Sequence, residues 1–436
     1  MRNAAIAALF LFASPLLAQP ELHLKDALKA GLEQNFDIRL ARNDVELAKD
    51  GNTAGMAGFL PSVNLNLGTT FQSSNLRQKF ASGLEVDRPG VGSTGLNGGI
   101  SVNWLVFDGG KMFLTKKKLG RQLNAAEIRL QNQILGFADS LSAAYYQVVL
   151  AGLDLKTLNQ SLSNAEERLR LAGEQQRIGT RPASDVLQAK MDLNQLKNRI
   201  LAQKKQIEIR KGALNLMMGR EPDLDFVPAD TVQLPDHLPF SQWKNKVLER
   251  NLNLKIQKEN LEISKLTVGE TKARFYPQVN LNSALNYQRS SSTAGFALFN
   301  RNVGPQAGLS LSMPLFSGVP VSRLVRMADR EVQSREIQLK LAENRLLFQL
   351  WRGVKNLEIF LESIETEKST EKLAGENLRI IQDRFRMGIA NSLEMREAES
   401  QLENAAIRLQ QLKFQARITG NQLLRLSAEL DAEGGK

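Results

Sequence analysis

The stretch FLPSVNLN at residues 59–66 returns as FYPQVNLN at residues 275–282, with six of its eight letters unchanged. It belongs to a longer duplication, because GISVNWLVFDGG at residues 99–110 is likewise matched by GLSLSMPLFSGV at residues 308–319. A chain that repeats the same segments in the same order is built from copies of one structural unit. The sequence therefore predicts two structural repeats.

Composition sets the boundaries of these repeats. Residues 220–240 contain four prolines and five acidic residues, which is typical of a linker. We therefore expect repeat 1 at residues 19–219, repeat 2 at residues 241–430 and a short tail at residues 431–436.

Each repeat contains two stretches in which apolar and polar residues alternate, and this is the period of a strand. In the first stretch, Val63 and Leu65 alternate with Asn64 and Asn66. We expect one β-hairpin at about residues 61–107 and another at about residues 277–316. The apolar residues expected on the second strands are Ile100, Val102, Trp104 and Val106 in repeat 1, and Leu309, Leu311, Met313 and Leu315 in repeat 2.

These hairpins are expected to enter a membrane. Strands of about 9–11 residues cross a bilayer with an apolar face toward lipid and a polar face toward the lumen. Four strands cannot close a barrel, since small barrels need about eight, and an open edge in lipid leaves backbone groups without partners. The chain must therefore share a barrel with other copies of itself. The residues expected to face the lumen are Asn64, Asn66, Asn103, Asn280 and Asn282.

After each hairpin the apolar period becomes that of a coiled coil. Apolar residues keep alternating spacings of four and three, as in a helix seam. Residues 112–178 as one helix would reach about 100 Å at 1.5 Å per residue, far longer than a globular core requires. In repeat 1 the seam runs through Phe137, Leu141, Ala144, Val148, Ala151, Leu155, Leu158, Leu162, Ala165, Leu169 and Ala172, and returns through Leu193, Leu196, Ile200, Ile207 and Leu214. In repeat 2 it runs through Leu346, Leu350, Leu357, Phe360, Ile364, Ala374, Leu378 and Ile381, with Glu367 and Glu371 as exceptions, and returns through Leu402, Ala405, Leu409, Leu412, Ala416, Leu423, Leu426 and Leu430.

Residues 1–18 read as a signal peptide for export. They pair a basic Arg2 with an apolar stretch and a small residue at Ala18. A membrane helix is the alternative, but a span needs about 20 apolar residues, and Pro15 interrupts this stretch. No later segment reads as apolar enough to span a membrane as a helix, so we expect any entry into a membrane to use strands.

The residue types available argue against an enzyme. The chain has no cysteine, and its two histidines, His23 and His237, lie far apart in the sequence. Thiolate metal sites, disulfides and a zinc or triad enzyme are therefore not supported, and we expect no metal and no cofactor. The net charge is +11, but basic residues alternate with acidic ones along the helices, so solvated helix faces are a better interpretation than nucleic-acid binding.

The order of these motifs resembles that of the outer-membrane efflux protein family, the TolC-like channels. The resemblance rests on the repeated strand phrases, on VFDGG and PLFSG at the strand-to-helix junctions, and on RIGTRPASDVLQAK and RMGIANSLEMREAE at the helix reversals. It implies a mainly α fold with a membrane β-barrel, in which a trimer joins a 12-strand β-barrel to a 12-helix periplasmic α-barrel. It implies location in the outer membrane of a Gram-negative bacterium, extending into the periplasm. It implies an exit duct for an efflux pump or type I secretion system, with an adaptor protein and an inner-membrane transporter as partners.

The resemblance also implies a gate at the periplasmic tip. Acidic residues past the second reversal fall on Glu394 and Glu397, and an acidic residue past the first falls on Asp185. Carboxylates ringing a narrow pore favour cations, although two glutamates three residues apart can equally decorate an exposed helix face. The tips expected to meet the adaptor are Gly179, Thr180 and Arg181 of repeat 1, and Gly388, Ile389 and Ala390 of repeat 2.

The chain departs from the family at the lock of this gate. The best-known member of the family ties its closed tip with a tyrosine and an arginine on the second hairpin, and these positions hold Phe385 and Ala390 here. Neither side chain can form that lock with Asp185. Arg181, Arg384 and Arg386 are the candidates to replace it.

Two other classes of protein compete with the channel. An exported coiled-coil scaffold without a pore explains the helix seams but not the asparagine-lined hairpins. A pore-forming toxin usually hides one amphipathic hairpin, whereas this chain has two at equivalent positions. The cargo is not encoded in any motif of this sequence.

Overall fold

The computed structural model describes residues 20–236, 238–294, 297–316 and 318–430. The predicted signal peptide and the predicted tail lie outside these described residues. Contacts divide the chain into two compact units, each built from segments of both predicted repeats. We call residues 20–41, 130–252 and 343–430 the helical unit, and residues 42–129 and 253–342 the sheet unit.

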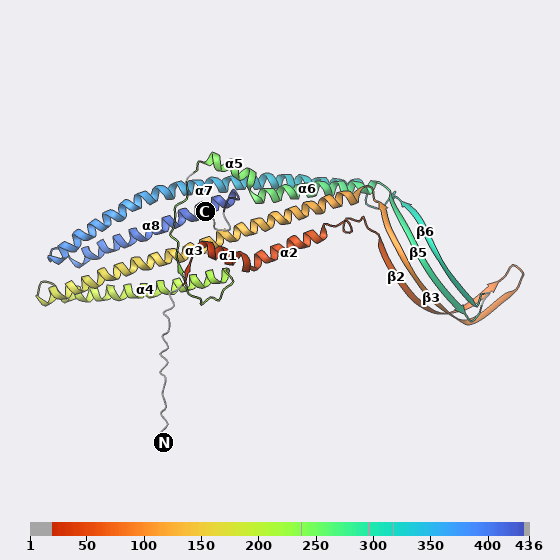
Figure 1. Ribbon diagram of the computed structural model, residues 1–436, viewed down its shortest axis with the longest axis horizontal. Coiled ribbons are helices and arrows are strands. Elements are labelled where there is room, and N and C mark those ends of the chain that lie inside the picture. The colour runs from red at the N-terminus through yellow and green to blue at the C-terminus, as the bar shows by residue number, and fades with distance from the viewer. Residues whose placement is uncertain (1–19, 237, 295–296, 317, 431–436) are drawn as a thin grey trace, which may run out of the picture. The chain divides into compact units, whose positions relative to one another are not determined.

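The order of elements is duplicated along the chain (Figure 1). Helix, hairpin, long helix and shorter returning helix occur once in each half, as the sequence repeats predicted. The first half contains β1 (Glu21–Leu22), α1 (Leu24–Gln34), α2 (Phe36–Gly51), β2 (Ser62–Lys79), β3 (Glu85–Phe107), α3 (Lys111–Arg177) and α4 (Ala183–Met217). The second contains β4 (Val227–Pro228), α5 (Phe240–Arg250), α6 (Leu252–Lys272), η1 (Ala273–Phe275), β5 (Gln278–Ser292), β6 (Phe299–Ser312), α7 (Val321–Arg386) and α8 (Ser392–Leu426).

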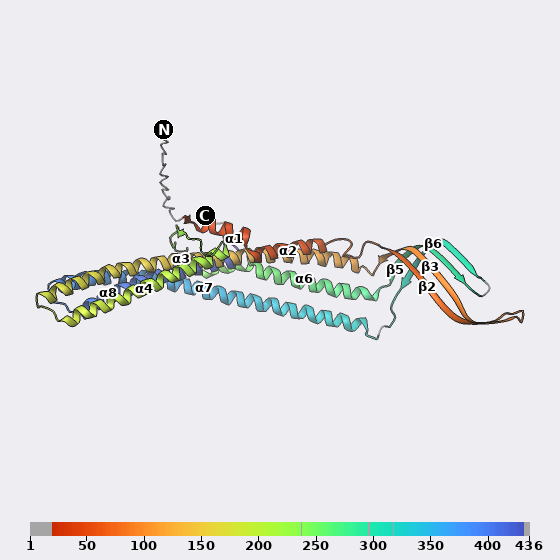
Figure 2. The same ribbon diagram turned by 90° about the horizontal axis from the view of Figure 1, so that it is seen from below.

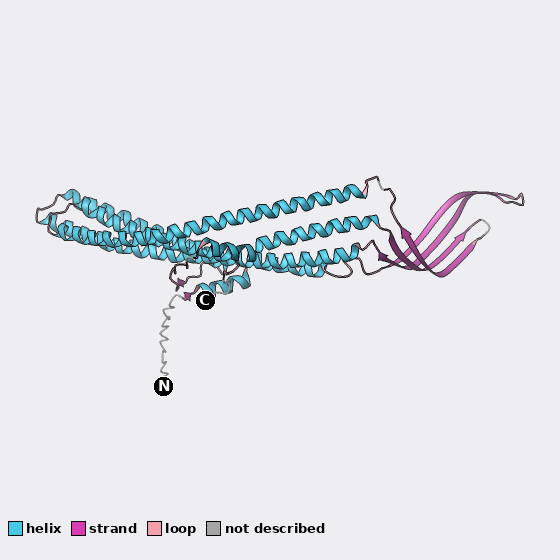
Figure 3. Cartoon of the chain, turned by 90° about the horizontal axis from the view of Figure 1, so that it is seen from above, coloured by secondary structure: helices cyan, strands magenta, loops and turns pink. Residues whose placement is uncertain are grey.

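The sheet unit holds the two predicted hairpins in one four-stranded sheet. The strand order is β2-β3-β5-β6, and all three neighbouring pairs are antiparallel. Figures 1 and 3 show these strands side by side. Pro61 and Pro277 directly precede β2 and β5, where a missing backbone N–H is tolerated.

The last strand is shorter than the alternating pattern suggested. It ends at Ser312, so Met313 and Leu315, which we expected on the strand, lie beyond it. The reason is Pro314, which has no N–H to give to a ladder and restricts the backbone of the residue before it. The β2–β3 hairpin is instead longer than a bilayer crossing needs, with strands of 18 and 23 residues.

Within the helical unit, α4 runs antiparallel to the C-terminal part of α3, and α8 runs antiparallel to the C-terminal part of α7 (Figures 1 and 2). Helix α3 matches the predicted residues 112–178 to within one residue at each end. The predicted seam residues are buried or half-buried: Leu141 and Leu350 are both fully inaccessible, and the return segments are buried at Leu214 and Leu423. Burial of this apolar stripe, at about 25 cal/mol per Å², stabilises helices whose isolated propensity is weak.

One sequence expectation about α3 was wrong. This helix contains an 18-residue window of mean hydropathy 1.3 that meets the length and composition of a membrane span. However, 56% of that window is buried in the structure. The extra hydropathy comes from apolar residues beside the seam: Ala138 and Val149 join Phe137 and Leu141 in one buried apolar cluster. We therefore assign this window to the protein core.

The segment predicted as a linker packs against the helical unit. Strand β4 pairs in parallel with β1, and Phe226 is almost fully buried. The Tyr145 hydroxyl donates to the Leu22 carbonyl oxygen at 2.7 Å or to Asp230 Oδ2 at 2.8 Å. The segment that connects the repeats is thus bound to α3 through Tyr145.

Candidate functional site

Both helix pairs reverse through the same turn geometry. Gly179 and Gly388 have φ values of +81° and +76°, a region that L side chains enter only at a cost. The Thr180 and Ile389 amides reach back to the carbonyls of Gln175 and Arg384 at 2.9 Å. These are the bonds of a Schellman cap. A Cβ at either glycine would meet open space, so the glycines serve the turn and not a close approach.

The first two turns of α8 carry the predicted gate glutamates. Asn391 caps this helix, because its side chain accepts a bond from the Glu394 amide at 2.9 Å. The Glu394 carboxylate lies 3.6 Å from Arg384 Nη1. Glu397 is exposed and accepts a bond from Gln401 Nε2 at 3.0 Å. Both carboxylates are therefore accessible to solvent on the surface of α8, and that of Glu394 lies beside Arg384.

Arg181 joins the tips of the two helix pairs. Its guanidinium donates to the Ala390 carbonyl oxygen and to Ser392 Oγ, the latter at 3.4 Å. It also donates to Asp185 Oδ2 at 3.1 Å. Its carbon Cζ lies 4.0 Å from the centre of the Phe385 ring. The Arg181 side chain is only 7% exposed, so these contacts are made away from bulk water.

Phe385 and Ala390, which stand where the lock described above has a tyrosine and an arginine, contribute to the tip in another way. Phe385 has no hydroxyl but supplies a buried ring face for a cation. Ala390 has no charge but supplies its backbone carbonyl. Of the three arginines considered from the sequence, Arg181 makes this link, while Arg384 pairs with Glu394 inside the second helix pair. The third, Arg386, reaches Glu167 at 4.0 Å.

The three predicted gate carboxylates have different kinds of partner. Asp185 accepts bonds from Arg181 and from the Ser392 hydroxyl, the latter at 3.0 Å. Asp185 is thus part of the link between the two tips. Glu394 and Glu397 have their contacts within the second helix pair.

A second polar link lies farther along the helices, and sequence reasoning missed it. Arg168 of α3 is 3% exposed and lies 3.0 Å from Asp192 of α4 and 2.9 Å from Glu399 of α8. Burial raises the pKa of Glu399 to about 7, although the Arg168 guanidinium opposes this rise. The sequence held no signal for this link, because Arg168 and Glu399 each look like a charge on a solvated helix face.

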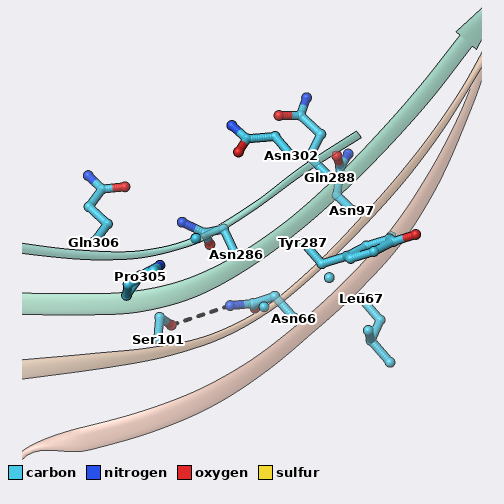
Figure 4. Close-up of a pocket in the computed structure, with 14 residues that line it drawn as sticks. Asn66, Leu67, Asn97, Ser101, Asn286, Tyr287, Gln288, Asn302, Pro305 and Gln306 are labelled. Atoms are coloured by element: carbon cyan, nitrogen blue, oxygen red, sulfur yellow. Dashed lines mark hydrogen bonds between the residues drawn. The ribbon is translucent and has the colours of Figure 1, made fainter. Parts of the chain in front are cut away.

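The sheet unit brings the five predicted asparagines onto one face. Asn64 lies opposite Ser101, and Asn103 lies opposite both Ser62 and Asn282. Asn66 Nδ2 donates to Ser101 Oγ at 3.4 Å (Figure 4). The register continues this polar face through further amides, namely Asn97, Asn286, Gln288, Asn302 and Gln306.

These amides line a hollow of about 720 Å³ on the sheet. Figure 4 shows side chains from all four strands around it. The opposite face of the sheet is apolar and exposed at residues such as Leu65, Phe71 and Leu309. The sheet is therefore two-sided, with an uncharged hydrogen-bonding face and an apolar face.

Comparison with known proteins agrees with this geometry. The family model "Outer membrane efflux protein" matches residues 27–220 and 243–429. The chain is 22% identical over 400 residues to "Proteases secretion protein PrtF" of Dickeya chrysanthemi, a match that covers 90% of this chain and 85% of that one. It is 21% identical over 428 residues to "Probable efflux pump outer membrane protein TtgC" of Pseudomonas putida, covering 94% and 81% of the two chains.

A solved structure shares the fold. The outer membrane channel CmeC of Campylobacter jejuni superposes with a TM-score of 0.78 at 15% identity, covering 95% of this chain and 87% of that one. The family match extends over both repeats. The chain therefore belongs to the outer membrane efflux protein family, the TolC-like channels of the bacterial outer membrane, which are transport proteins and not enzymes.

Proposed function

We propose that the chain forms a homotrimeric exit duct for a tripartite efflux pump or a type I secretion system. In this role it meets a periplasmic adaptor protein and serves an inner-membrane transporter. The observation that carries the proposal is the four-stranded sheet, which has free edges at β2 and β6 and one apolar face.

The free edges argue for assembly. Backbone N–H and C=O groups of an edge strand have no partner in hydrocarbon, and each unsatisfied group there costs several kcal/mol. Pairing β2 of one copy with β6 of the next satisfies both edges at once. Three copies of the sheet supply twelve strands, which exceeds the roughly eight strands that a small barrel needs.

Mass measurement of the detergent-extracted protein tests this assembly. We expect a trimer that fractionates with outer membranes and requires detergent. A monodisperse folded monomer would overturn the shared barrel. Extraction without detergent would favour the exported coiled-coil scaffold instead.

We further propose that Glu394 and Glu397 line the gate, with Asp185 holding the tips together. The support is the position of both glutamates in the first two turns of α8, directly after the reversal. If the α8 helices of three copies surround the narrow end, six carboxylates lie close together in confined water, where like charges interact strongly.

The turn residues Gly179, Thr180, Gly388 and Ile389 are proposed to dock the adaptor. They are exposed, and large apolar side chains accompany them, with Ile178 at 67% and Ile389 at 62% exposure. Exposed apolar side chains grouped at one end suit a protein partner. Arg181 and Ala390, predicted with this set, are buried in the link between the tips, so we propose that they support the docking surface from beneath.

Crosslinking from the tips tests the docking proposal. A photocrosslinker at Ile389 should capture an adaptor protein in cells, whereas one at exposed Lys355 of α7 should not. Capture at both positions to the same extent would remove the support for a tip site. Identification of the co-purified transporter decides between efflux and protein secretion, the two roles printed for the relatives.

A further inference from the structure

Two arginines face each other on the apolar side of the sheet. Arg289 of β5 is the direct antiparallel partner of Arg301 of β6. Residues opposite each other share a face, and Leu96 of β3 continues the same row beyond Arg289. The other members of this face near the pair include Tyr287, Phe299 and Val303.

The arginines are held against aromatic rings. Cζ of Arg289 lies 5.3 Å from the centre of the Phe299 ring, and Cζ of Arg301 lies 5.5 Å from the centre of the Tyr287 ring. Each ring stabilises a cation that is placed over it by about 0.5–1 kcal/mol at an exposed site. Both arginines are exposed, so their guanidinium groups are fixed in direction but accessible.

No acidic residue neutralises this pair within the described strands. Strands β2, β5 and β6 contain neither Asp nor Glu, and the two acids of β3, Glu85 and Asp87, lie beside Arg77 at the far end of the longer hairpin. Like charges directly opposite each other destabilise an antiparallel pair. The arrangement therefore calls for an external anion.

The position along the strand identifies the source of that anion. Val279 opens the apolar face of β5, ten residues before Arg289. Ten residues span about 33 Å along a strand, or about 25 Å along the membrane normal at the tilt of transmembrane barrels, which is the height of their apolar band. The arginines thus lie at the end of the band that is distant from the helices that precede β5, where headgroups begin.

We propose that Arg289 and Arg301 bind the phosphate of a phosphorylated glycolipid in the outer leaflet. This proposal rests on the proposed membrane barrel. Arginine presents paired N–H groups that match two phosphate oxygens, and the neighbouring rings suit the boundary between headgroups and acyl chains. The phosphate neutralises the positive charge of the two arginines. The bound lipid thereby fixes the position of the barrel along the membrane normal.

Native mass spectrometry of the trimer in detergent tests the proposal. The probes are diphosphorylated lipid A, the same lipid without its phosphates, and inorganic phosphate. We expect adducts of diphosphorylated lipid A only, and binding at least about tenfold weaker in the variant Arg289→Gln with Arg301→Gln, a change of about 1.4 kcal/mol. Arg77→Gln, an arginine of the same sheet that already has acidic neighbours, should bind as the unmodified chain does.

Other outcomes overturn the proposal. Equal binding in the double glutamine variant would place the lipid elsewhere, and equal binding of inorganic phosphate would mean a general anion site. If the double variant does not assemble, Arg289→Lys with Arg301→Lys keeps the charge and should bind with intermediate affinity; unchanged affinity would reject paired arginine recognition. A monomer mass in the same spectra would instead reject the proposed barrel, so the two failures are distinguishable.

Discussion

Arg181 at the first helix reversal donates a hydrogen bond to the backbone carbonyl oxygen of Ala390 at the second, across 209 residues of sequence. The same guanidinium lies over the Phe385 ring and binds Asp185. Because its acceptors include a backbone carbonyl and a ring, the link does not depend on one carboxylate. This arrangement favours Arg181 as the residue that holds the resting tip.

Replacing Arg181 should therefore open the resting channel. Arg181→Gln removes charge-assisted hydrogen bonds worth about 1.5–3 kcal/mol each, so we expect single-channel conductance of the resting state to rise several-fold in a planar bilayer. Arg384→Gln is the matched control, because Arg384 makes its ion pair within one helix pair. An equal rise in both variants would count against Arg181 as the link.

Asp185→Ala should have a smaller effect than Arg181→Gln. The arginine keeps the Ala390 carbonyl and the Phe385 ring when Asp185 is lost. We expect only a slight rise in resting conductance. If Asp185→Ala opens the channel as far as Arg181→Gln does, the carboxylate is the essential partner.

Neutralising the two α8 glutamates should change ion selectivity. Carboxylates in confined water favour cations because screening there is incomplete. Unmodified channels should prefer cations and be blocked by multivalent cations from the periplasmic side, and Glu394→Gln with Glu397→Gln should lose both traits. Glu376→Gln on α7 serves as the control. A block that survives the double change would assign the acidic ring to other residues.

A β-branched residue at the second reversal should impair export without preventing assembly. A side chain other than glycine in the left-handed region costs about 1–2 kcal/mol, and Gly388 has a φ of +76°. We expect Gly388→Val to insert and assemble but to lose export, while Gly388→Asn, which tolerates this region better, retains most of it. Failure of Gly388→Val to reach the membrane would make the glycine a folding requirement.

The Glu399 carboxyl should make stability depend on pH near neutrality. Burial holds its pKa at about 7, against an ordinary value of 4.5. Between these values the folded chain binds more protons than the unfolded chain, so this group lowers the free energy of unfolding as pH rises, and adds no further change above about pH 7.

Thermal unfolding of the helices at pH 5 and pH 7.5 measures this dependence. The groups around Glu399 are Arg168, Asp192 and Glu403. Glu399→Gln should reduce the loss of melting temperature between the two pH values, whereas exposed Glu397→Gln should not. An unchanged pH dependence in Glu399→Gln would show that another group titrates in this range.

Patterns that repeat along the chain were predictable from the sequence. Burial of Leu141 and Leu350 follows from the four-three spacing, and the shared face of Asn64 and Asn66 follows from the period of two. These signals are local, because a helix or strand fixes which residues share a face. The strand ends at Ser312 although the alternation continues to Leu315, because Pro314 has no N–H to give to the ladder.

Contacts between distant segments were not predictable in the same way. Arg168 and Glu399 are separated by the end of repeat 1, the linker and most of repeat 2, and each alone resembles a charge on a solvated helix face. The link from Arg181 to Ala390 uses a backbone carbonyl, which every residue has. Such contacts depend on how the helix pairs pack against each other, and the periodicity of the sequence does not predict that packing.

The polar face of the sheet carries amides and hydroxyls. No charged side chain lies among the paired residues of this face between Asn64 on β2 and Gln306 on β6. Amides donate and accept hydrogen bonds, so they can replace part of the hydration shell of an anion, a cation or a neutral molecule. Such a wall solvates many solutes and retains none of them strongly. In the proposed duct, passage through the barrel would therefore be indifferent to the sign of the cargo, and discrimination would have to occur before the cargo reaches the membrane.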